Sequence, residues 1–234
     1  MNKLKVMVSL VLLVYIGFVI FQFRSNEFWA NALDAILLPL ISIAYFKENK
    51  RPNLYFSLFL ICYSVSDLMI FIVDFIPYAY FYYVGNGLYI IAYTALFIKI
   101  IKSLSFQYII LNFKFHLVVL TALNIYIAYV LQDIVNPYVG MTNEYFVEIA
   151  YNVSMLLVLT ASLLNYLYRD DKKSLLIFLG SLSIVFSEVL GVAYMYVDQQ
   201  NLLNFLVTTL TLLAFYFYFT QSNLKNEEVK QLAS

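Results

Sequence analysis

The stretch "LYFSLFLICYSVSDLMIFI", Leu54 to Ile72, contains a single charged side chain, Asp67, in a run that is otherwise mostly apolar. Its length is that of a helix crossing the hydrocarbon core of a membrane, for which about 17 to 25 residues are needed. A carboxylate at such a depth is costly, and it normally faces the interior of a helix bundle or a wet cavity. The stretch therefore predicts a transmembrane helix and indicates a first candidate functional residue.

The composition of the whole chain leads to the same class of protein. Of its 234 residues, 63% are hydrophobic and 12% are charged, and the mean hydropathy is +0.82, whereas soluble domains carry about 25% charged residues. The 22 tyrosines and 21 phenylalanines suit helices that meet lipid headgroups and a partly polar interior. Because the net charge is zero, no basic surface indicates a nucleic-acid partner. We predict an integral membrane protein.

Charged and turn-forming residues divide the chain into apolar segments of spanning length. The first, although Lys3 and Lys5 precede it, is predicted to be a helix rather than a secretory signal, because no small-residue cleavage site follows it. The longest connection is predicted at Gln132 to Phe146, which holds Asn136, Pro137 and Gly140. The predicted fold is all-α, a single polytopic membrane domain over residues 1–234 with eight transmembrane helices at 6–23, 30–46, 54–72, 78–98, 115–131, 147–168, 174–197 and 202–220.

The basic residues predict the orientation, because Lys and Arg near helix ends accumulate on the cytoplasmic side. With eight crossings, both termini share a side, and of the 14 basic residues only Arg24 falls on the opposite one. We therefore predict cytoplasmic termini and a multi-pass protein of a bacterial inner (cytoplasmic) membrane. The opposite face carries the acidic residues Glu27, Asp74, Asp133, Glu144 and Asp198.

A second acid is predicted at the same depth as Asp67. At a rise of 1.5 Å per residue, Asp67 lies about 20 Å from the cytoplasmic start of its helix, and Glu188 in "FLGSLSIVFSEVLGVAYM" lies about 21 Å from the start of the seventh. Both acids follow a serine, Ser66 or Ser187, and both helices run in the same direction. The spacing hints at a repeat of four helices about an axis along the membrane normal.

Two buried carboxyl groups in different protonation states are what general acid and base chemistry requires. We therefore predict Asp67 and Glu188 as a catalytic pair. The alternative is structural: each acid would only accept hydrogen bonds between helices.

Polar neighbours of the two acids are candidate substrate-binding residues. Ser64 and Asp67 lie roughly on one helix face with Asp74, which is expected near the outer end of the helix and solvated. The fourth helix presents a polar face. In the seventh, Gly180, Ser183, Ser187 and Gly191 form a small-residue stripe that lets another helix approach. The predicted substrate-binding residues are Ser64, Ser66, Asn86, Tyr89, Tyr93 and Ser187.

Other chemistry is not indicated. His116, the one histidine, has no second His or Cys nearby and is interpreted as interfacial, and Cys62, the one cysteine, as a packing residue. Asn124, Asn152 and Asn165 are intramembrane amides that could bridge helices. No metal site and no cofactor are predicted, since the chain has no GxSxG or Walker motif and no lysine deep in a helix for a retinal.

Four short motifs resemble those of the YhhN-like membrane proteins, whose characterised members are lysoplasmalogenases. "DAILLPL" (Asp34 to Leu40) resembles the family's second-helix motif, with Pro39 kept and Asp34 where a Lys is usual. "YSVSDL" resembles the third, with Asp67 kept and Ser66 in place of Gly. "YYVGNGLYIIAYTALF" resembles the fourth helix, with Tyr93 near where a His is common. "GSLSIVFSEVLG" resembles the late motif, with Gly180 and Ser187 kept and Glu188 in place of Asp.

The resemblance spans roughly residues 28–220 and implies an eight-helix hydrolase. Its substrate would be a membrane lipid or lysolipid, a lysoplasmalogen, whose vinyl-ether bond is cleaved to a fatty aldehyde and a glycerophospho-headgroup. The carboxyl groups of Asp67 and Glu188 would act as the catalytic acid and base, and the residues do not decide which is which.

Two other functions remain open. In a proton-coupled transporter, the same acids would bind and release a proton at mid-membrane. The chain has few glycines, and the prolines in or beside the second and third helices are Pro39 and Pro77. This pattern predicts unbroken helices and so argues against a transporter. In a non-catalytic membrane scaffold, the acids would only join helices. The sequence predicts no oligomeric state.

Overall fold

The computed structural model describes residues 3–139 and 143–224 and is helical throughout these ranges apart from short connections. Eight of its segments are long and apolar enough to cross a membrane, so the predicted all-α class and number of spans are confirmed for the described chain. The elements are α1 (Lys3–Phe23), α2 (Glu27–Glu48), α3 (Leu54–Leu68), the 3-10 helix η1 (Met69–Phe75), α4 (Tyr78–Ile101), α5 (Phe106–Asn112), α6 (Lys114–Val139), α7 (Asn143–Arg169), α8 (Lys172–Tyr196) and α9 (Asn201–Ser222).

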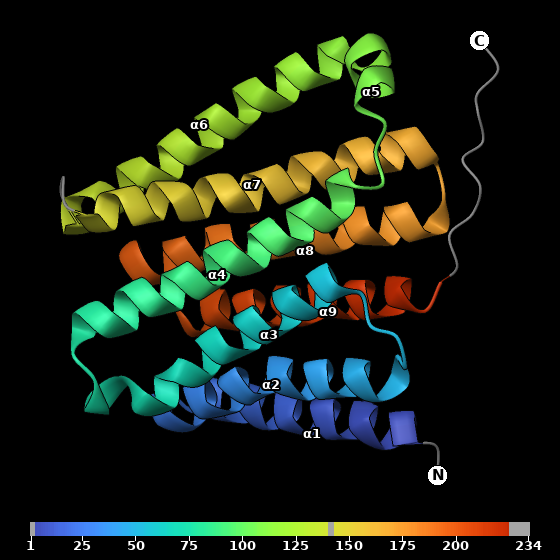
Figure 1. Cartoon of the computed structure of the whole chain (residues 1–234). Coiled ribbons are helices and arrows are strands. Elements are labelled where there is room, and N and C mark those ends of the chain that lie inside the picture. Colours follow the sequence, from blue (N-terminus) through green and yellow to red (C-terminus); the bar gives the residue numbers. More distant parts are fainter. Residues whose placement is uncertain (1–2, 140–142, 225–234) are drawn as a thin grey trace.

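The long helices form an antiparallel bundle whose two ends differ (Figure 1). The first and last described helices, α1 and α9, begin and end at the same end of the bundle, as an even number of crossings requires. The loops between α1 and α2, η1 and α4, and α8 and α9 lie at the other end. We call these the terminal end and the distal end.

The centre of the bundle is made by α3, α4, α7, α8 and α9, and α1 and α6 lie at its outer edges (Figure 1). Aromatic rings fill the core: Phe59 of α3 stacks on Phe215 of α9, with ring centroids 5.3 Å apart, and Tyr218 packs edge-on against it at 5.5 Å. These three side chains are fully buried. The outer helices α1 and α6 leave most of their apolar side chains uncovered by the chain, as suits helices that face lipid.

Local sequence sets the helix starts. Asn26, Asn53 and Asp171 precede α2, α3 and α8, and each side chain accepts a hydrogen bond from a backbone N–H of the first turn. Ser25 and Asp170, with φ of 54° and 46°, take the left-handed conformation that turns the chain between helices. These short polar turns allow consecutive helices to pack side by side.

One predicted connection is wrong in part. The segment from Gln132 to Phe146 was predicted as the longest loop, but α6 continues to Val139, with Pro137 inside it, and α7 begins at Asn143. Burial of Gln132 and Val135 favours the helix over the turn signals. Gly140 lies outside the described residues. The longest connection between spans is instead the one from α4 to α6, which contains α5, a short helix that was not predicted.

The third span, Leu54–Phe75, is a continuous helical segment, as predicted, but it is not a uniform α-helix. The α-helical winding ends at Leu68 and continues as the 3-10 helix η1, one residue after the functional candidate Asp67. Within η1 only Met69 is buried, so neighbouring helices contribute little to hold this segment in α-helical winding. The predicted four-helix repeat stays a prediction.

Candidate functional site

A cavity of about 550 Å³ lies between α2, α3, α4, α7, α8 and α9. Its wall carries four carboxyl groups, from Asp34, Asp67, Glu148 and Glu188, and no Lys, Arg or His among the described residues that line it. We call it the acidic cavity. Two other lining residues, Tyr78 and Met195, are 64% and 57% exposed and belong to the distal ends of α4 and α8. The cavity therefore reaches the surface at the distal end.

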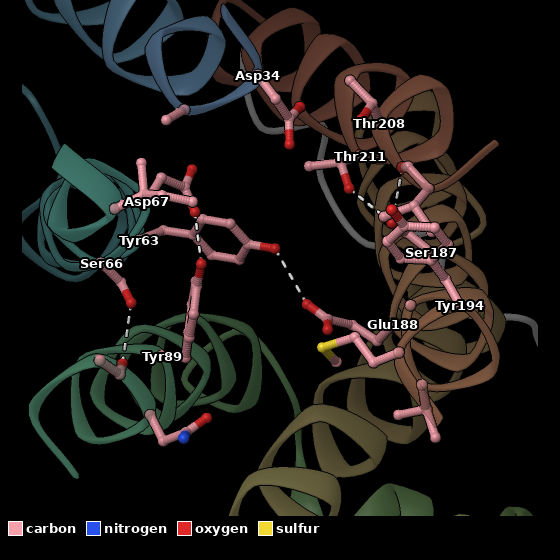
Figure 2. Close-up of a pocket in the computed structure, with 18 of the residues that line it drawn as sticks. Asp34, Tyr63, Ser66, Asp67, Tyr89, Ser187, Glu188, Tyr194, Thr208 and Thr211 are labelled. Atoms are coloured by element: carbon pink, nitrogen blue, oxygen red, sulfur yellow. Dashed lines mark hydrogen bonds between the residues drawn. The ribbon is translucent and has the colours of Figure 1, made fainter. Parts of the chain in front are cut away.

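Asp67 projects from α3 into this cavity and is held by a tyrosine of the neighbouring helix. The hydroxyl of Tyr89 in α4 donates to Oδ1 of Asp67 at 2.5 Å (Figure 2). Beside it, Ser66 donates its hydroxyl to the backbone carbonyl of Gly85 at 3.0 Å and so joins α3 to α4. The α3 and α4 backbones thereby fix the position of the Asp67 carboxyl group.

Glu188 projects from α8 into the same cavity and accepts more hydrogen bonds. The hydroxyl of Tyr63 donates to Oε1 of Glu188 at 3.0 Å, and the hydroxyl of Tyr93 donates to the same oxygen. Tyr63 is buried and Tyr93 is fully buried, so both phenols are held by packing. Figure 2 shows Tyr63 crossing from α3 toward Glu188. Two donors from α3 and α4 stabilise a carboxylate on α8.

The two acids are connected through their tyrosines. Tyr63, which donates to Glu188, lies four residues before Asp67 on α3, and its ring packs edge-on against that of Tyr89, with centroids 4.7 Å apart. Tyr151 of α7 closes the group, with ring centroids 5.9 Å from Tyr89 and 5.7 Å from Tyr93. Rings in direct contact therefore connect the two carboxyl groups.

Two further acids of the cavity were not predicted as site residues. Asp34, noted in the sequence only as a departure from a family motif, projects from α2 on the side of the cavity where Thr208 of α9 lies (Figure 2). Glu148 of α7 accepts the hydroxyl of Tyr82 at 2.6 Å, nearer the distal end. A charged side chain inside an apolar span could have marked both as inward-facing, but their positions in the sequence alone do not show which helices they meet.

The seam between α8 and α9 supports the Glu188 side of the cavity. Ser187 donates to the carbonyl of Val207 at 2.8 Å and exchanges a hydrogen bond with Thr211 at 2.6 Å. At Gly180, a Cβ atom would meet the ring of Tyr218 at 2.7 Å. The predicted small-residue stripe thus does allow close approach of another helix, and that helix is α9.

The predicted site residues fall into three groups. Asp67, Ser66, Asn86, Tyr89, Ser187 and Glu188 all line the acidic cavity. Tyr93 lies behind the wall and reaches the cavity through its bond to Glu188. Ser64 does not line it, because its hydroxyl pairs with Ser42 of α2 at 2.8 Å in the buried contact between α2 and α3. Sequence reasoning missed Tyr63 and Tyr151. The four-residue spacing from Tyr63 to Asp67 could have indicated Tyr63, because it places these two side chains on one face of α3.

The remaining polar candidates have structural positions. Asp74 is exposed beyond the cavity, and His116 is exposed on α6 beside Phe113 and Phe115. Asn124 donates to Thr160 at 2.7 Å and so bridges α6 and α7, while Asn152 lines the acidic cavity. Cys62 is buried. No group of His, Cys, Asp and Glu able to hold a metal ion occurs in residues 3–139 and 143–224.

Comparison of the chain with protein-family models, with curated proteins and with solved structures found no match. The geometry and chemistry of the acidic cavity are therefore the basis for inferring function.

Proposed function

We propose that the chain crosses a bacterial cytoplasmic membrane eight times, with the terminal end of the bundle in the cytoplasm. Eight apolar helices of sufficient length support the crossings. The basic residues of the described chain support the orientation, because all of them except Arg24 belong to the terminal end. Lys225 and Lys230 lie outside the described residues.

Single cysteines placed at Ser25 and Lys50 in a Cys62→Ala background test this orientation. Impermeant maleimide should label position 25 and not position 50 in intact cells, and the reverse pattern would contradict the orientation.

Within this bundle we propose a lipid hydrolase that cleaves the ether bond of a lyso-vinyl-ether lipid. The supporting observation is that two carboxyl groups from different spans, Asp67 and Glu188, line one cavity and have different hydrogen-bond environments. Glu188 accepts two phenol donors, whereas one phenol donates to Asp67. General acid and base catalysis needs such a pair of unequal carboxyl groups.

The unequal environments suggest the roles. Glu188, which accepts two hydrogen bonds, is the carboxylate base. Asp67 is the acid that protonates the β-carbon of the vinyl ether, the alkene carbon that is not bonded to oxygen. The resulting oxocarbenium ion is attacked by water, whose proton passes to Glu188, and a hemiacetal forms. Transfer of that proton to the ether oxygen breaks the carbon–oxygen bond, while the hemiacetal hydroxyl returns a proton to Asp67. The products are a fatty aldehyde and the glycerol hydroxyl of the headgroup, and both acids are restored.

Aldehyde release from a lyso-vinyl-ether lipid by the purified protein is the direct test. Asp67→Asn and Glu188→Gln should each reduce the rate by about a hundredfold or more, because general acid or base catalysis contributes about 10² to 10⁴. The matched control is Asp74→Asn, on the same span but exposed outside the cavity, and it should retain wild-type activity. Aldehyde release at the wild-type rate by either Asp67→Asn or Glu188→Gln would contradict the mechanism.

A second candidate function, a proton-coupled carrier, is favoured by the change of winding in the third span. Runs of 3-10 helix longer than about four residues are uncommon, and η1 covers the seven residues from Met69 to Phe75 at the distal end of the third span, starting two residues after Asp67. If the protein is a carrier, solute uptake into liposomes should follow an imposed pH gradient and disappear in Asp67→Asn. Uptake without aldehyde release would assign the cavity to transport. If the protein showed neither uptake nor aldehyde release, the acids would be assigned a purely structural role in a scaffold.

A further inference from the structure

Three tyrosines of α4 hold three carboxyl groups in a row along the acidic cavity. Each donates its hydroxyl to an acid of a different helix, in the pairs Tyr82 with Glu148 of α7, Tyr89 with Asp67 of α3, and Tyr93 with Glu188 of α8. Successive tyrosines are seven and four residues apart, a spacing that keeps them on one helix face. At 1.5 Å per residue, these steps are about 10 and 6 Å along α4. The acids therefore follow one another from the distal end toward the middle of the bundle.

A fourth acid, Asp34 of α2, enters the cavity from the side opposite to α4 (Figure 2). None of the four carboxyl groups forms an ion pair with a described residue. The tyrosine hydroxyls that bond to three of them stabilise a carboxylate but carry no positive charge. Acids inside a membrane-spanning segment are costly, and a cation beside them offsets part of that cost.

The surface between the acids suits an organic cation. Aromatic rings line the outer part of the cavity, and those of Tyr78 and Tyr82 have centroids 5.8 Å apart. Faces of such rings attract ammonium groups. Apolar side chains, among them Leu37 and Val192, line the cavity as well. No group of His, Cys, Asp and Glu in the described chain is able to hold a metal ion. The cavity therefore offers separate positions for positive charge, with apolar surface between them.

A buried amide is an independent indication of a ligand. Asn152 of α7 lines the acidic cavity and is 2% exposed, and its Nδ2 has no hydrogen-bond partner in the described chain. A buried polar group without a partner is uncommon and calls for an explanation. Asn152 lies one turn after Glu148, so both side chains share a helix face. A half turn of the amide lets Nδ2 donate to an acceptor while its carbonyl oxygen accepts from an ammonium group.

We propose that the acidic cavity binds a linear polyamine, a chain of methylene groups that carries two or more ammonium groups. One ammonium group lies at Glu148 and Asn152, and another lies deeper, among Asp34, Asp67 and Glu188. The methylene groups between them lie against the tyrosine rings and the apolar side chains. The volume of about 550 Å³ falls in the usual range for small-molecule sites. The inference does not rest on the proposed hydrolase, and it names a solute class for the carrier.

Binding can be measured directly with the full-length protein in a non-ionic detergent, by isothermal titration calorimetry at constant ionic strength. The probes are spermidine, a linear triamine, and butylamine, an alkyl chain with one amino group. Because the titration contains no lipid substrate, its result does not depend on aldehyde release. A protein that fails to bind spermidine but releases aldehyde would refute this inference and leave the hydrolase standing.

We expect spermidine to bind at least about tenfold more tightly than butylamine, because it places ammonium groups at more than one acid. Asp34→Asn should weaken spermidine binding by about tenfold or more, the usual effect of losing a hydrogen bond to a charged group. The matched control, Asp74→Asn, removes an exposed acid outside the cavity and should bind as the wild type does.

If Asp34→Asn fails to fold, Glu148→Gln gives the same test, because the new amide oxygen can still accept from Tyr82. Three results would each overturn the proposal. They are absence of spermidine binding, equal affinities for spermidine and butylamine, and equal affinities of the cavity variant and the Asp74→Asn control for spermidine.

Discussion

At the scale of single residues, the sequence predicted the two central acids and two of their hydrogen-bond partners but not the whole set of contacts. Asp67 and Glu188 were identifiable because a charge inside an apolar span is costly, and Tyr89 and Tyr93 because they share a helix face with Asn86. Helical spacing shows which side chains share a face, but not which helix that face meets. The bond from Tyr63 of α3 to Glu188 of α8 depends on packing between spans 125 residues apart in sequence, and no local pattern encodes it.

The bond between Tyr93 and Glu188 can be measured by a double-mutant cycle. Tyr93→Phe removes a donor to a buried carboxylate and should lower the free energy of unfolding by about 1.5 to 3 kcal/mol, the usual contribution of a hydrogen bond to a charged group. In a Glu188→Gln background the same change should cost less, with a coupling energy of about 0.5 to 3 kcal/mol. Denaturant unfolding in detergent gives the four values.

The control for this cycle is Tyr15→Phe, which removes a hydroxyl bonded to Thr209 between α1 and α9. Tyr15 shares no partner with Glu188, so the effects of Tyr15→Phe and Glu188→Gln should add within about 0.5 kcal/mol. A coupling energy near zero for Tyr93 and Glu188 would show that their bond does not stabilise the protein.

At the scale of helices, apolar length predicted where the spans lie, and burial decided where they end. The turn residues Asn136 and Pro137 indicated a loop, yet α6 continues through them because Gln132 and Val135 are buried against neighbouring helices. In the third span the opposite occurs, since the chain leaves α-helical winding after Leu68 where its neighbours bury only Met69. Both differences arise from contacts between helices, which the sequence of one helix does not contain.

The close contact of α8 with α9 depends on Gly180. Gly180→Ala would place a Cβ atom 2.7 Å from the ring of Tyr218, a buried side chain whose hydroxyl donates to Ser181. Overpacking of this kind costs about 1 to 3 kcal/mol, which exceeds the gain of about 1 kcal/mol or less in helix propensity. The thermal unfolding midpoint should therefore fall.

Gly191→Ala, on the same helix, is the matched control, because nothing lies within 4 Å of the added Cβ. Its midpoint should stay constant or rise through the gain in helix propensity. If Gly180→Ala were as stable as Gly191→Ala, the Tyr218 ring would have to move freely, contrary to its complete burial.

The start of α8 should make stability depend on pH. Burial of Asp171 raises its pKa, but the hydrogen bonds from Ser174 and the charge of Arg169 outweigh burial and hold the pKa below its ordinary value of 3.8. A carboxyl group with a lowered pKa in the folded state stabilises the fold above its unfolded pKa, and this contribution is lost as the pH falls through the folded value. Unfolding of wild type and Asp171→Asn should differ at pH 7, and the difference should shrink below about pH 4. A constant difference down to pH 2 would contradict this assignment.

At the scale of the whole molecule, the charges divide the bundle into two chemically different ends. The acidic cavity opens at the distal end. A second cavity, whose lining includes Arg51, Lys99, Arg169 and Lys173, lies at the terminal end, and the rings of Phe59, Phe215 and Tyr218 fill the core between the two. The sequence predicted this polarity in outline, because all basic residues except Arg24 fall on one face, while Glu27, Asp74, Asp133, Glu144 and Asp198 make the other face acidic. It could not predict the cavities, whose walls combine residues from several helices.

This division predicts how the proposed hydrolase should select its substrates. Four carboxyl groups line the acidic cavity and no basic side chain does so among its described residues, so a phosphate would have to remain outside its mouth. Two like charges about 4 Å apart repel by about 4 kcal/mol at an effective dielectric constant of about 20. We therefore expect the rate of aldehyde release to fall as the headgroup becomes more anionic, from an uncharged alkenylglycerol through a zwitterionic choline lipid to an anionic glycerol lipid.

The rates would be compared for lipids with the same alkenyl chain in mixed micelles at two ionic strengths. Salt should reduce the differences, since exposed charges at the mouth are screened over about 10 Å at 0.1 M. Fastest cleavage of the anionic lipid would show that its headgroup meets a basic surface, and would move the substrate entrance away from the distal end.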